Sequence, residues 1–446
     1  MAIAMLRELR ADGFRSLEKF SFSIEPGLNV LVGPNGAGKT NIIKFLEFLS
    51  NTTNGSISET VSRSGGVSEL FSRRDYFSED RDIVFGFSGS GPNFNFSTEN
   101  APSTDIVTYE FDARISLNQN QILFLSQTLR LWINKINYTR SNEQPDIEIA
   151  WIRDNKKTGT LSSYLVNSRK LGTRKDELYN ELREFALSGM LLEAPIYHYQ
   201  NYRMPFMFRI AADLNSGRAY NIVPSKAREA SDIAEPPGIR PDGSGLGATI
   251  YALKRAAHHS NQFQIYSSMY HEFYSEDLFP RLKEFCRIID PHMIDVDATS
   301  QIVENKIVVQ CSFDLSGKYI ERPIAILSDG TVKWLSLVTA VLTSRSAFCI
   351  EEPENYLHPR LQEEVIALLR SVLEDGNSQE RFALVTTHSE TLLNALYPQE
   401  VVVTRMELGS TRCTRTTDSS HIDRMINETG FGLGYFYKTG ALDELD

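Results

Sequence analysis

The segment Gly33–Thr40 has the sequence GPNGAGKT and lies between a short apolar run and a stretch with helical periodicity. The run before it, Leu28–Val32, has the length and composition of a buried strand. A glycine-rich turn that leads from a strand into a helix points several backbone N–H groups into one concavity, and the positive end of the helix adds to the attraction for phosphate. The sequence therefore predicts a phosphate-binding loop at the start of an α/β domain.

The side chains and backbone of this loop have expected roles. Gly36 and Gly38 permit backbone angles that a Cβ atom would forbid. Lys39 is expected to reach the β- and γ-phosphates of ATP, and the hydroxyl group of Thr40 is expected to ligate Mg²⁺. The residues of this segment predicted to bind the nucleotide are Asn35, Gly36, Ala37, Gly38, Lys39, Thr40 and Asn41.

A pair of carboxylates follows another apolar run, in the sequence AFCIEEPENYLHP of Ala347–Pro359. Successive side chains at the end of a strand point to opposite sides. Glu351 is therefore expected to hold the Mg²⁺ shell through water, and Glu352 to orient or deprotonate the water that attacks the γ-phosphate. An acidic loop after a core strand is the structural alternative, and the phosphate loop upstream favours the catalytic interpretation.

Two weaker motifs flank this acidic pair. Leu327–Thr331 (LSDGT) precedes a helical stretch, where Ser328 and Gly330 would form a second anion site, although a serine there can also serve only as an N-cap. In the segment LVTTHSE, Leu384–Glu390, a predicted strand ends at His388, which could donate a hydrogen bond to the γ-phosphate, with a purely structural histidine as the alternative.

The rest of the chain indicates an insertion between two parts of a core. Residues 52–190 alternate Ser-, Gly- and Asn-rich stretches with short apolar runs, and residues 117–136 are expected to be helical. Residues 194–199 are expected to form a strand that returns to the core, and residues 246–259 and 262–289 two long helices. The final third alternates strands and helices, which is typical of α/β proteins.

Composition and charge limit the classes of function. Hydrophobic residues make up 41% of the 446 residues and charged residues 23%, with no long apolar run for a membrane span and no signal peptide at the N-terminus. The net charge of −11 gives no general support for nucleic-acid binding, which needs Lys and Arg, although a local patch remains open. Four cysteines without CxxC spacing argue against a structural zinc site. We therefore expect a cytoplasmic protein that has reduced thiols and no membrane partner.

These four motifs, in this order, resemble the nucleotide-binding domain of ABC-type ATPases, and most of all the SMC/RecF/OLD-like (AAA15/AAA21) branch. The segments Phe14–Leu17 (FRSL) and Asp242–Leu246 (DGSGL) also resemble motifs of that branch. The resemblance implies an α/β fold: an ABC-type ATPase core with a P-loop and a mixed sheet flanked by helices, an inserted α+β arm, and lever helices. The expected regions are an N-terminal part of the core at 1–51, the arm at 52–190, a return strand, loop and lever helices at 191–300, and a C-terminal part of the core at 301–446.

The resemblance also implies a partner. In this family two ATP molecules with Mg²⁺ are held between two copies that face each other head to tail, so we expect a homodimer, with higher homo-oligomers open. The residues implied to act in trans are Ser328 and Gly330, and those implied to act in cis are Lys39, Thr40, Glu351, Glu352 and His388. Family members also carry a glutamine that senses Mg²⁺ and the attacking water. Gln200 is the candidate, with a surface glutamine as the alternative reading and Arg203 as another residue facing phosphate.

Similar stand-alone ATPases act beside a separately encoded effector, as in PARIS- or Septu-like antiviral systems. Only 58 residues follow His388, so no nuclease domain of the OLD type is expected there. The leading hypothesis is an ATP-hydrolysing sensor or regulatory subunit of an antiviral defence system that controls a separate nuclease or toxin. A RecF-like DNA repair ATPase and an ATP-bound scaffold with little turnover are the alternatives. The Glu-Glu pair, where transporter ATPases have Asp-Glu, suggests slow hydrolysis.

Overall fold

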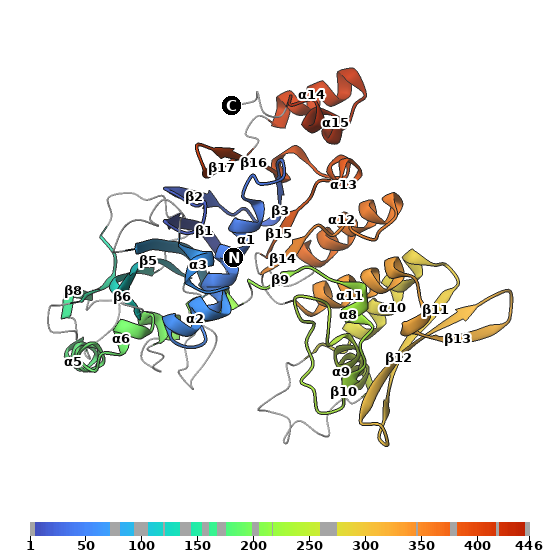
Figure 1. Ribbon diagram of the computed structural model, residues 1–446, viewed down its shortest axis with the longest axis horizontal. Coiled ribbons are helices and arrows are strands. Elements are labelled where there is room, and N and C mark those ends of the chain that lie inside the picture. Colours follow the sequence, from blue (N-terminus) through green and yellow to red (C-terminus); the bar gives the residue numbers. More distant parts are fainter. Residues whose placement is uncertain are drawn as a thin grey trace. The chain divides into compact units, whose positions relative to one another are not determined.

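The computed structural model describes residues 5–71, 81–92, 106–118, 121–133, 144–153, 160–166, 175–198, 205–215, 217–258, 274–344, 347–374, 381–415 and 419–441 (Figure 1). The chain forms two compact units. Unit 1 comprises residues 1–218, 376–382 and 402–415, and unit 2 comprises residues 219–375, 383–401 and 416–446. The region boundaries expected from the sequence at 51/52, 190/191 and 300/301 remain predictions.

Unit 1 is built around a seven-stranded sheet in which every neighbouring pair is antiparallel, with the order β2-β1-β4-β5-β6-β7-β8. Its strands are β1 (Met5–Asp12), β2 (Phe20–Ser23), β4 (Arg81–Pro92), β5 (Ile106–Asn118), β6 (Gln121–Ile133), β7 (Ile147–Ile152) and β8 (Thr160–Val166). The helices of unit 1 are α1 (Lys39–Asn51), α2 (Ile57–Arg63), α3 (Val67–Leu70), α5 (Lys175–Leu187), α6 (Met190–Glu193) and α7 (Pro205–Asn215).

One face of this sheet carries the aromatic core of unit 1. Phe85 of β4 contacts Phe48 of α1 edge to face, with 5.3 Å between the ring centroids, and Phe14 packs against Phe45 of the same helix at 5.1 Å. All four rings are fully buried. Buried rings of this size contribute strongly to core stability. The helix that follows the phosphate loop is thus anchored along its length to the sheet.

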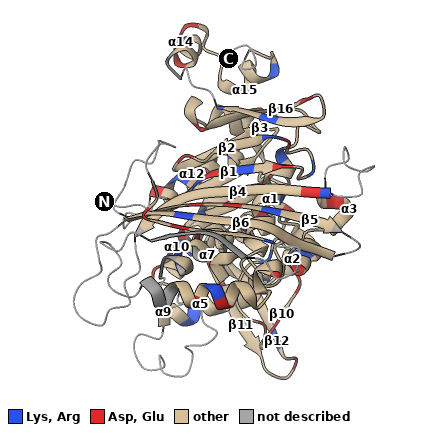
Figure 2. Ribbon diagram, turned by 90° about the vertical axis from the view of Figure 1, so that its left-hand side faces the viewer, with Lys and Arg blue, Asp and Glu red and all other residues tan. Residues whose placement is uncertain are grey.

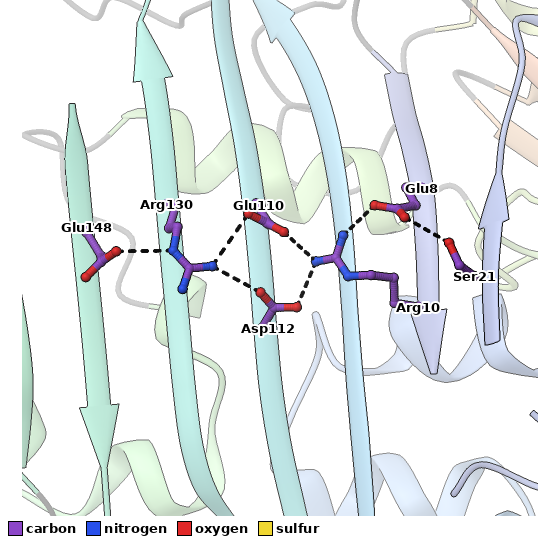
Figure 3. A network of polar contacts seen from close by, with 7 residues as sticks. All are labelled: Glu8, Arg10, Ser21, Glu110, Asp112, Arg130 and Glu148. Atoms are coloured by element: carbon purple, nitrogen blue, oxygen red, sulfur yellow. Dashed lines mark hydrogen bonds and ion pairs between the residues drawn. The ribbon is translucent and has the colours of Figure 1, made fainter. Parts of the chain in front are cut away.

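The opposite face of the sheet carries a ladder of charges across its strands (Figure 3). Arg10 of β1 lies 3.0 Å from Glu110 and 2.7 Å from Asp112, both on β5. The guanidinium group crosses β4 at Gly86, where an added Cβ would overlap the Asp112 carboxylate. The ladder continues through Arg130 of β6 to Glu148 of β7 at 3.1 Å. Figure 2 shows basic and acidic residues interspersed along these strands.

Two local predictions for unit 1 were wrong. Residues 121–133 form strand β6 where a helix was expected, because their alternating burial matches the pleat and they pair along their length with β5. The expected strand at 194–199 contains a short 3₁₀ helix, η2 (Ile196–His198). The amide group of Gln127 accepts from the backbone N–H of Ile196 at 2.6 Å and donates to the carbonyl of Ala194 at 3.0 Å, so a side chain takes the hydrogen bonds that a strand partner would provide.

Unit 1 also contains the strand series β17-β16-β3, formed by β3 (Gly27–Val32), β16 (Val401–Glu407) and β17 (Ser410–Arg415). β3 is the buried strand expected before the phosphate loop, and five of its six residues are buried. β16 and β17 form an antiparallel hairpin.

Unit 2 contains the strand series β15-β14-β9, in which β9 (Ala219–Tyr220) pairs in parallel with β14 (Ala347–Glu351), beside β15 (Phe382–Thr386). A separate antiparallel sheet consists of β10 (Ser231–Asp232), β11 (Met293–Gln301), β12 (Lys306–Asp314) and β13 (Tyr319–Pro323). The helices are α8 (Pro224–Ala227), α9 (Leu246–His258), α10 (Leu278–Ile289), α11 (Asp329–Thr343), α12 (Pro359–Glu374), α13 (Glu390–Asn394), α14 (Ser419–Thr429) and α15 (Leu433–Lys438), with short 3₁₀ helices η3 (Ile324–Ile326) and η4 (Pro398–Glu400).

The α/β class predicted from the sequence is confirmed, with parallel and antiparallel strand pairs and helices beside the sheets. The described residues of 52–190 form both strands and helices, and strands β4–β8 lie in the same sheet as β1 and β2. α9 covers nearly all of the first predicted long helix, 246–259, whereas α10 covers only the C-terminal part of the second, 262–289. Residues 274–277 are not helical, and residues 259–273 lie outside the described part of the chain. Within the described residues, no helix is long and apolar enough to cross a bilayer.

Candidate functional site

The phosphate loop, residues 33–40, leads from β3 into the 13-residue helix α1. Gly36 has φ 83° and Gly38 has φ 100°, a region that side chains other than glycine rarely adopt. An added Cβ on Gly36 would meet nothing within 4 Å, whereas one on Gly38 would overlap the hydroxyl of Thr411 and lie 2.9 Å from its Cβ. Gly36 is thus required by its backbone angle alone, and Gly38 by its backbone angle and by close packing against β17.

Lys39 is the first residue of α1, and its side chain is 7% exposed. Its ammonium group donates to the carbonyl oxygens of Gly33 at 2.7 Å and Pro34 at 3.1 Å, so it lies over the loop that would bind phosphate. Thr40 is exposed in the first turn of the helix. The Lys39 ammonium group and the positive N-terminal end of α1 fit the phosphates that the sequence predicts here. The exposed hydroxyl of Thr40 fits the predicted Mg²⁺ ion.

The start of α1 is tied to the FRSL segment by hydroxyl and amide groups. Asn41 donates to the Ser16 hydroxyl at 2.7 Å, and the Ser16 and Thr411 hydroxyl groups lie 2.6 Å apart. Ser16 belongs to the segment that resembled a family motif, and the structure gives it a supporting role beside the loop. Asn35 is exposed and Ala37 is buried within the loop itself.

The acidic loop, residues 351–359, begins at the last residue of β14. Glu352 has φ 44°, a left-handed angle that is strained for a residue with a side chain. Its N–H still donates to the carbonyl of Thr386 on β15 at 3.0 Å, and its carboxylate accepts from Asn355 at 2.9 Å. The imidazole Nε2 of His388 lies 3.9 Å from the same carboxylate. The structure therefore brings together the two residues predicted to act on the attacking water and the γ-phosphate.

Glu354 holds the chain at His388. One oxygen of its carboxylate accepts from the backbone N–H of His388 at 2.9 Å and from the hydroxyl of Thr387 at 2.8 Å. The other oxygen is buried and has no hydrogen-bond partner. Sequence reasoning did not assign Glu354 a role. The signal was present, because a third carboxylate lies close behind the acidic pair in the string EEPE.

The signature loop, residues 327–331, forms the start of helix α11. Ser328 is the N-cap: its hydroxyl accepts from the backbone N–H of Thr331 at 3.2 Å and lies 2.8 Å from the Thr331 hydroxyl. An added Cβ on Gly330 would lie 3.0 Å from the carbonyl oxygen of Tyr356 in the acidic loop. The capping role that was the alternative for Ser328 is therefore observed, and the residue is also exposed.

A buried lysine follows in the same helix. Lys333 is 1% exposed and donates to the carbonyl of Ile222 at 3.0 Å. Burial lowers the pKa of this lysine to about 8, against the opposing charges of Glu354 and Glu352. Sequence reasoning missed this residue, although a single lysine inside the apolar stretch TVKWLSLVTAVL was a visible signal.

The predicted residues divide between the two units. The phosphate loop belongs to unit 1, whereas Ser328, Gly330, Glu351, Glu352 and His388 belong to unit 2. Gln200, the candidate for the glutamine that senses Mg²⁺, and Arg203 lie outside the described residues.

Comparison with known proteins gives partial matches to individual relatives. The chain is 27% identical to the chromosome partition protein Smc of Rhodopseudomonas palustris over 174 residues, which are 37% of this chain and 13% of that protein. It is 25% identical to the DNA replication and repair protein RecF of Lactobacillus acidophilus over 131 residues, which are 29% of this chain and 26% of that protein. The chain thus matches about a quarter or less of the length of these relatives.

Among solved structures, the chain is similar to the Smc head domain with an extended coiled coil bound to the C-terminal domain of ScpA derived from Pyrococcus furiosus. The TM-score is 0.47 with 12% identity, covering 95% of this chain and 100% of that one. The family described as "AAA domain, putative AbiEii toxin, Type IV TA system" matches residues 28–394, well over half of the 446 residues. The phosphate loop, signature loop, acidic loop and His388 all fall inside this range, and the chain belongs to this family of AAA domains.

Proposed function

We propose that this protein binds ATP with Mg²⁺ and hydrolyses it slowly, as the regulatory subunit of an antiviral defence system that controls a separately encoded toxin or nuclease. The observation that carries the ATPase part is the phosphate loop, with two left-handed glycines, a buried lysine and a 13-residue helix behind it. The regulatory part rests on the resemblance of the four motifs to stand-alone ATPases that act beside a separate effector; the family description names a putative toxin of a toxin–antitoxin system and no regulator.

In the proposed reaction, water attacks the γ-phosphorus and the bond to the oxygen that bridges the β- and γ-phosphates breaks, which gives ADP and phosphate. Glu352 accepts the proton of the attacking water, and His388 donates a hydrogen bond to the γ-phosphate. Lys39 binds the phosphate oxygens. Mg²⁺, held by the Thr40 hydroxyl and through water by Glu351, would neutralise the charge that develops on the phosphates. Ser328 and Gly330 act on the nucleotide held by a second copy.

The ATPase proposal is tested with three variants. Lys39→Ala is expected to lose ATP binding, Glu352→Gln to bind ATP without hydrolysis and accumulate as a dimer, and Ser328→Arg to bind ATP without dimerising. Fluorescent-nucleotide titration, phosphate release and native mass spectrometry give the three readouts. A Glu352→Gln protein that stays monomeric in saturating ATP argues against the head-to-tail dimer. Equal rates near zero for wild type and Glu352→Gln would favour an ATP-bound scaffold.

The regulatory part is tested by co-purification. The tagged protein is expressed with its neighbouring genes, and the complex is weighed with and without ATP. A stable complex with a separate nuclease or toxin, lost on Lys39→Ala, is expected. Absence of any protein partner, together with no protection against a broad phage panel, would remove the proposal.

A RecF-like role in DNA repair is the second candidate, because the partial matches include proteins named RecF and Smc. This role predicts DNA-stimulated ATP hydrolysis and DNA binding that weakens steeply as salt rises. DNA binding that is absent at low salt, with a hydrolysis rate unchanged by DNA, would exclude it.

A further inference from the structure

Arg228 contacts the residues on either side of Ser328, the serine of the signature loop. Its guanidinium group donates to the carbonyl oxygen of Leu327 at 2.7 Å and lies 2.6 Å from the carboxylate of Asp329. These two residues flank Ser328 directly. The Arg228 side chain is 21% exposed and the Asp329 side chain 56% exposed, so the hydrogen bond to the buried Leu327 is the better shielded of the two contacts.

The chemistry of arginine suits this task. A guanidinium group is planar and rigid, so two of its N–H groups fix the angle between two acceptors, which a lysine ammonium cannot do. Ser328 itself caps α11 through Thr331, and its carbonyl oxygen accepts from the backbone N–H of Val332 at 3.1 Å. The guanidinium thus adds two contacts from outside the helix to the turn that presents the serine hydroxyl.

The segment that carries Arg228 begins beside the acidic strand. β9 pairs with β14 at Ala219↔Cys349 and Tyr220↔Ile350, directly before Glu351. The segment then passes Ile222, whose carbonyl accepts from Lys333 of α11, and ends at Arg228. Residues 219–228 thus connect the strand that ends in the candidate catalytic carboxylates with the loop that carries the signature serine.

We infer that Arg228 is a positioning residue: it orients Ser328 for its action on the nucleotide bound by a second copy. Residues 219–228 connect β14 to the signature loop and so fix the position of Ser328 relative to the acidic strand. This inference rests on the proposed ATP-dependent dimer. Arg228 lies about 100 positions before the signature loop and in no recognisable motif, so only the fold reveals it.

The test uses the full chain carrying Glu352→Gln as parent, with Arg228→Gln, Arg228→Lys and Lys226→Gln added separately. Lys226 lies two residues before Arg228 and forms an ion pair with Glu229 at the surface, which makes it the matched control. Arg228→Gln is expected to keep the ATP affinity within about twofold and to raise the dimer dissociation constant at least tenfold. Arg228→Lys should fall between, and Lys226→Gln should match the parent.

Hydrogen exchange of the amides of residues 328–332 gives an independent readout on the monomer. Faster exchange in Arg228→Gln, and not in Lys226→Gln, supports the hold on Ser328 without any dimer. The role of Arg228 is overturned if the parent forms a dimer and the Arg228→Gln dimer is equally tight, or if exchange at residues 328–332 is unchanged. Either result leaves the proposed dimer itself intact. A parent that binds ATP and remains monomeric overturns the proposed dimer, and the trans action of Ser328 with it.

Discussion

At Glu352, the candidate general base, the backbone turns out of the strand with φ 44°, which costs on the order of 1–2 kcal/mol for a residue with a Cβ. The turn is stabilised by hydrogen bonds to Thr386 and Asn355. The two adjacent glutamates and their place after a buried strand could be predicted from the sequence. The left-handed turn and the neighbouring His388 could not, because both depend on β15 lying beside β14.

Lys333 gives a pH-dependent prediction for stability. Its pKa is about 8 in the folded protein and 10.5 as the ordinary value. Below pH 8 the buried lysine is charged, which lowers the free energy of unfolding. As the pH rises from 8 toward 10.5, the folded protein loses this proton while the unfolded chain keeps it. The free energy of unfolding of wild type therefore rises by about 3 kcal/mol over this range. Lys333→Met removes this gain, so its stability advantage over wild type should shrink from pH 7 to pH 10.5 in urea unfolding.

The difference between wild type and Lys333→Met isolates this one group, because every other ionisable residue is the same in both proteins. The lost hydrogen bond to Ile222 adds a term that does not vary with pH. A stability difference that is constant across this range would contradict the depressed pKa.

Gly36 and Gly38 of the phosphate loop give the second prediction. Gly36→Ala should cost about 1 kcal/mol, from the left-handed backbone alone, because its Cβ enters open space. Gly38→Ala should cost more, because its Cβ overlaps the Thr411 hydroxyl. Urea unfolding measures both losses, and Thr411→Ala added to Gly38→Ala should recover part of the second. Equal losses at the two positions would show that β17 does not restrict the loop.

At the scale of elements, the charge ladder of the seven-stranded sheet depends on one missing side chain. A Cβ on Gly86 of β4 would overlap the Asp112 carboxylate and lie 2.7 Å from the carbonyl oxygen of Phe111 and 2.9 Å from Arg10. Gly86→Ala should therefore separate the pairs across β4 and lower the free energy of unfolding by about 2 kcal/mol. Val84→Ala, on the same strand and face and 44% exposed, is the matched control and should have little effect. Thermal or urea unfolding decides, and equal effects would argue against the ladder.

The element errors in the sequence prediction have a common cause. The residues of β6 include the apolar run Ile122–Leu125, whose period does not separate a strand from a helix. Pairing with β5 selects the strand. Likewise, the 3₁₀ turn at Ile196–His198 exists because Gln127, about 70 positions earlier, occupies its backbone groups. In both cases hydrogen bonds to residues distant in the sequence outweigh the local preference for a helix or a strand.

At the scale of the whole molecule, the net charge of −11 predicts how salt affects association. Two acidic copies repel each other, and salt at about 0.1 M screens that repulsion between charges more than about 10 Å apart. The ATP-bound dimer of Glu352→Gln should therefore become tighter as KCl rises from 50 to 300 mM. Binding to DNA would show the opposite sign, because it depends on the release of counterions from phosphate. Mass photometry across this series measures the dimer, and a dimer that weakens with salt would point to attractive charge pairs at its interface.

The sequence by itself determined the α/β class, the phosphate loop with its two special glycines, and the acidic pair with its strand, because these depend on residues adjacent in the chain. It also indicated the signature loop and His388 as candidate site residues, because they follow the phosphate loop in the order found in ABC-type ATPases. The tertiary structure decided what surrounds them: Glu354 holding His388, Arg228 holding the turn of Ser328, and a lysine buried in α11. The physical reason is that a hydrogen bond or a buried charge is fixed by groups close in space, and in these three cases those groups lie 34, 99 and 111 positions apart in the chain.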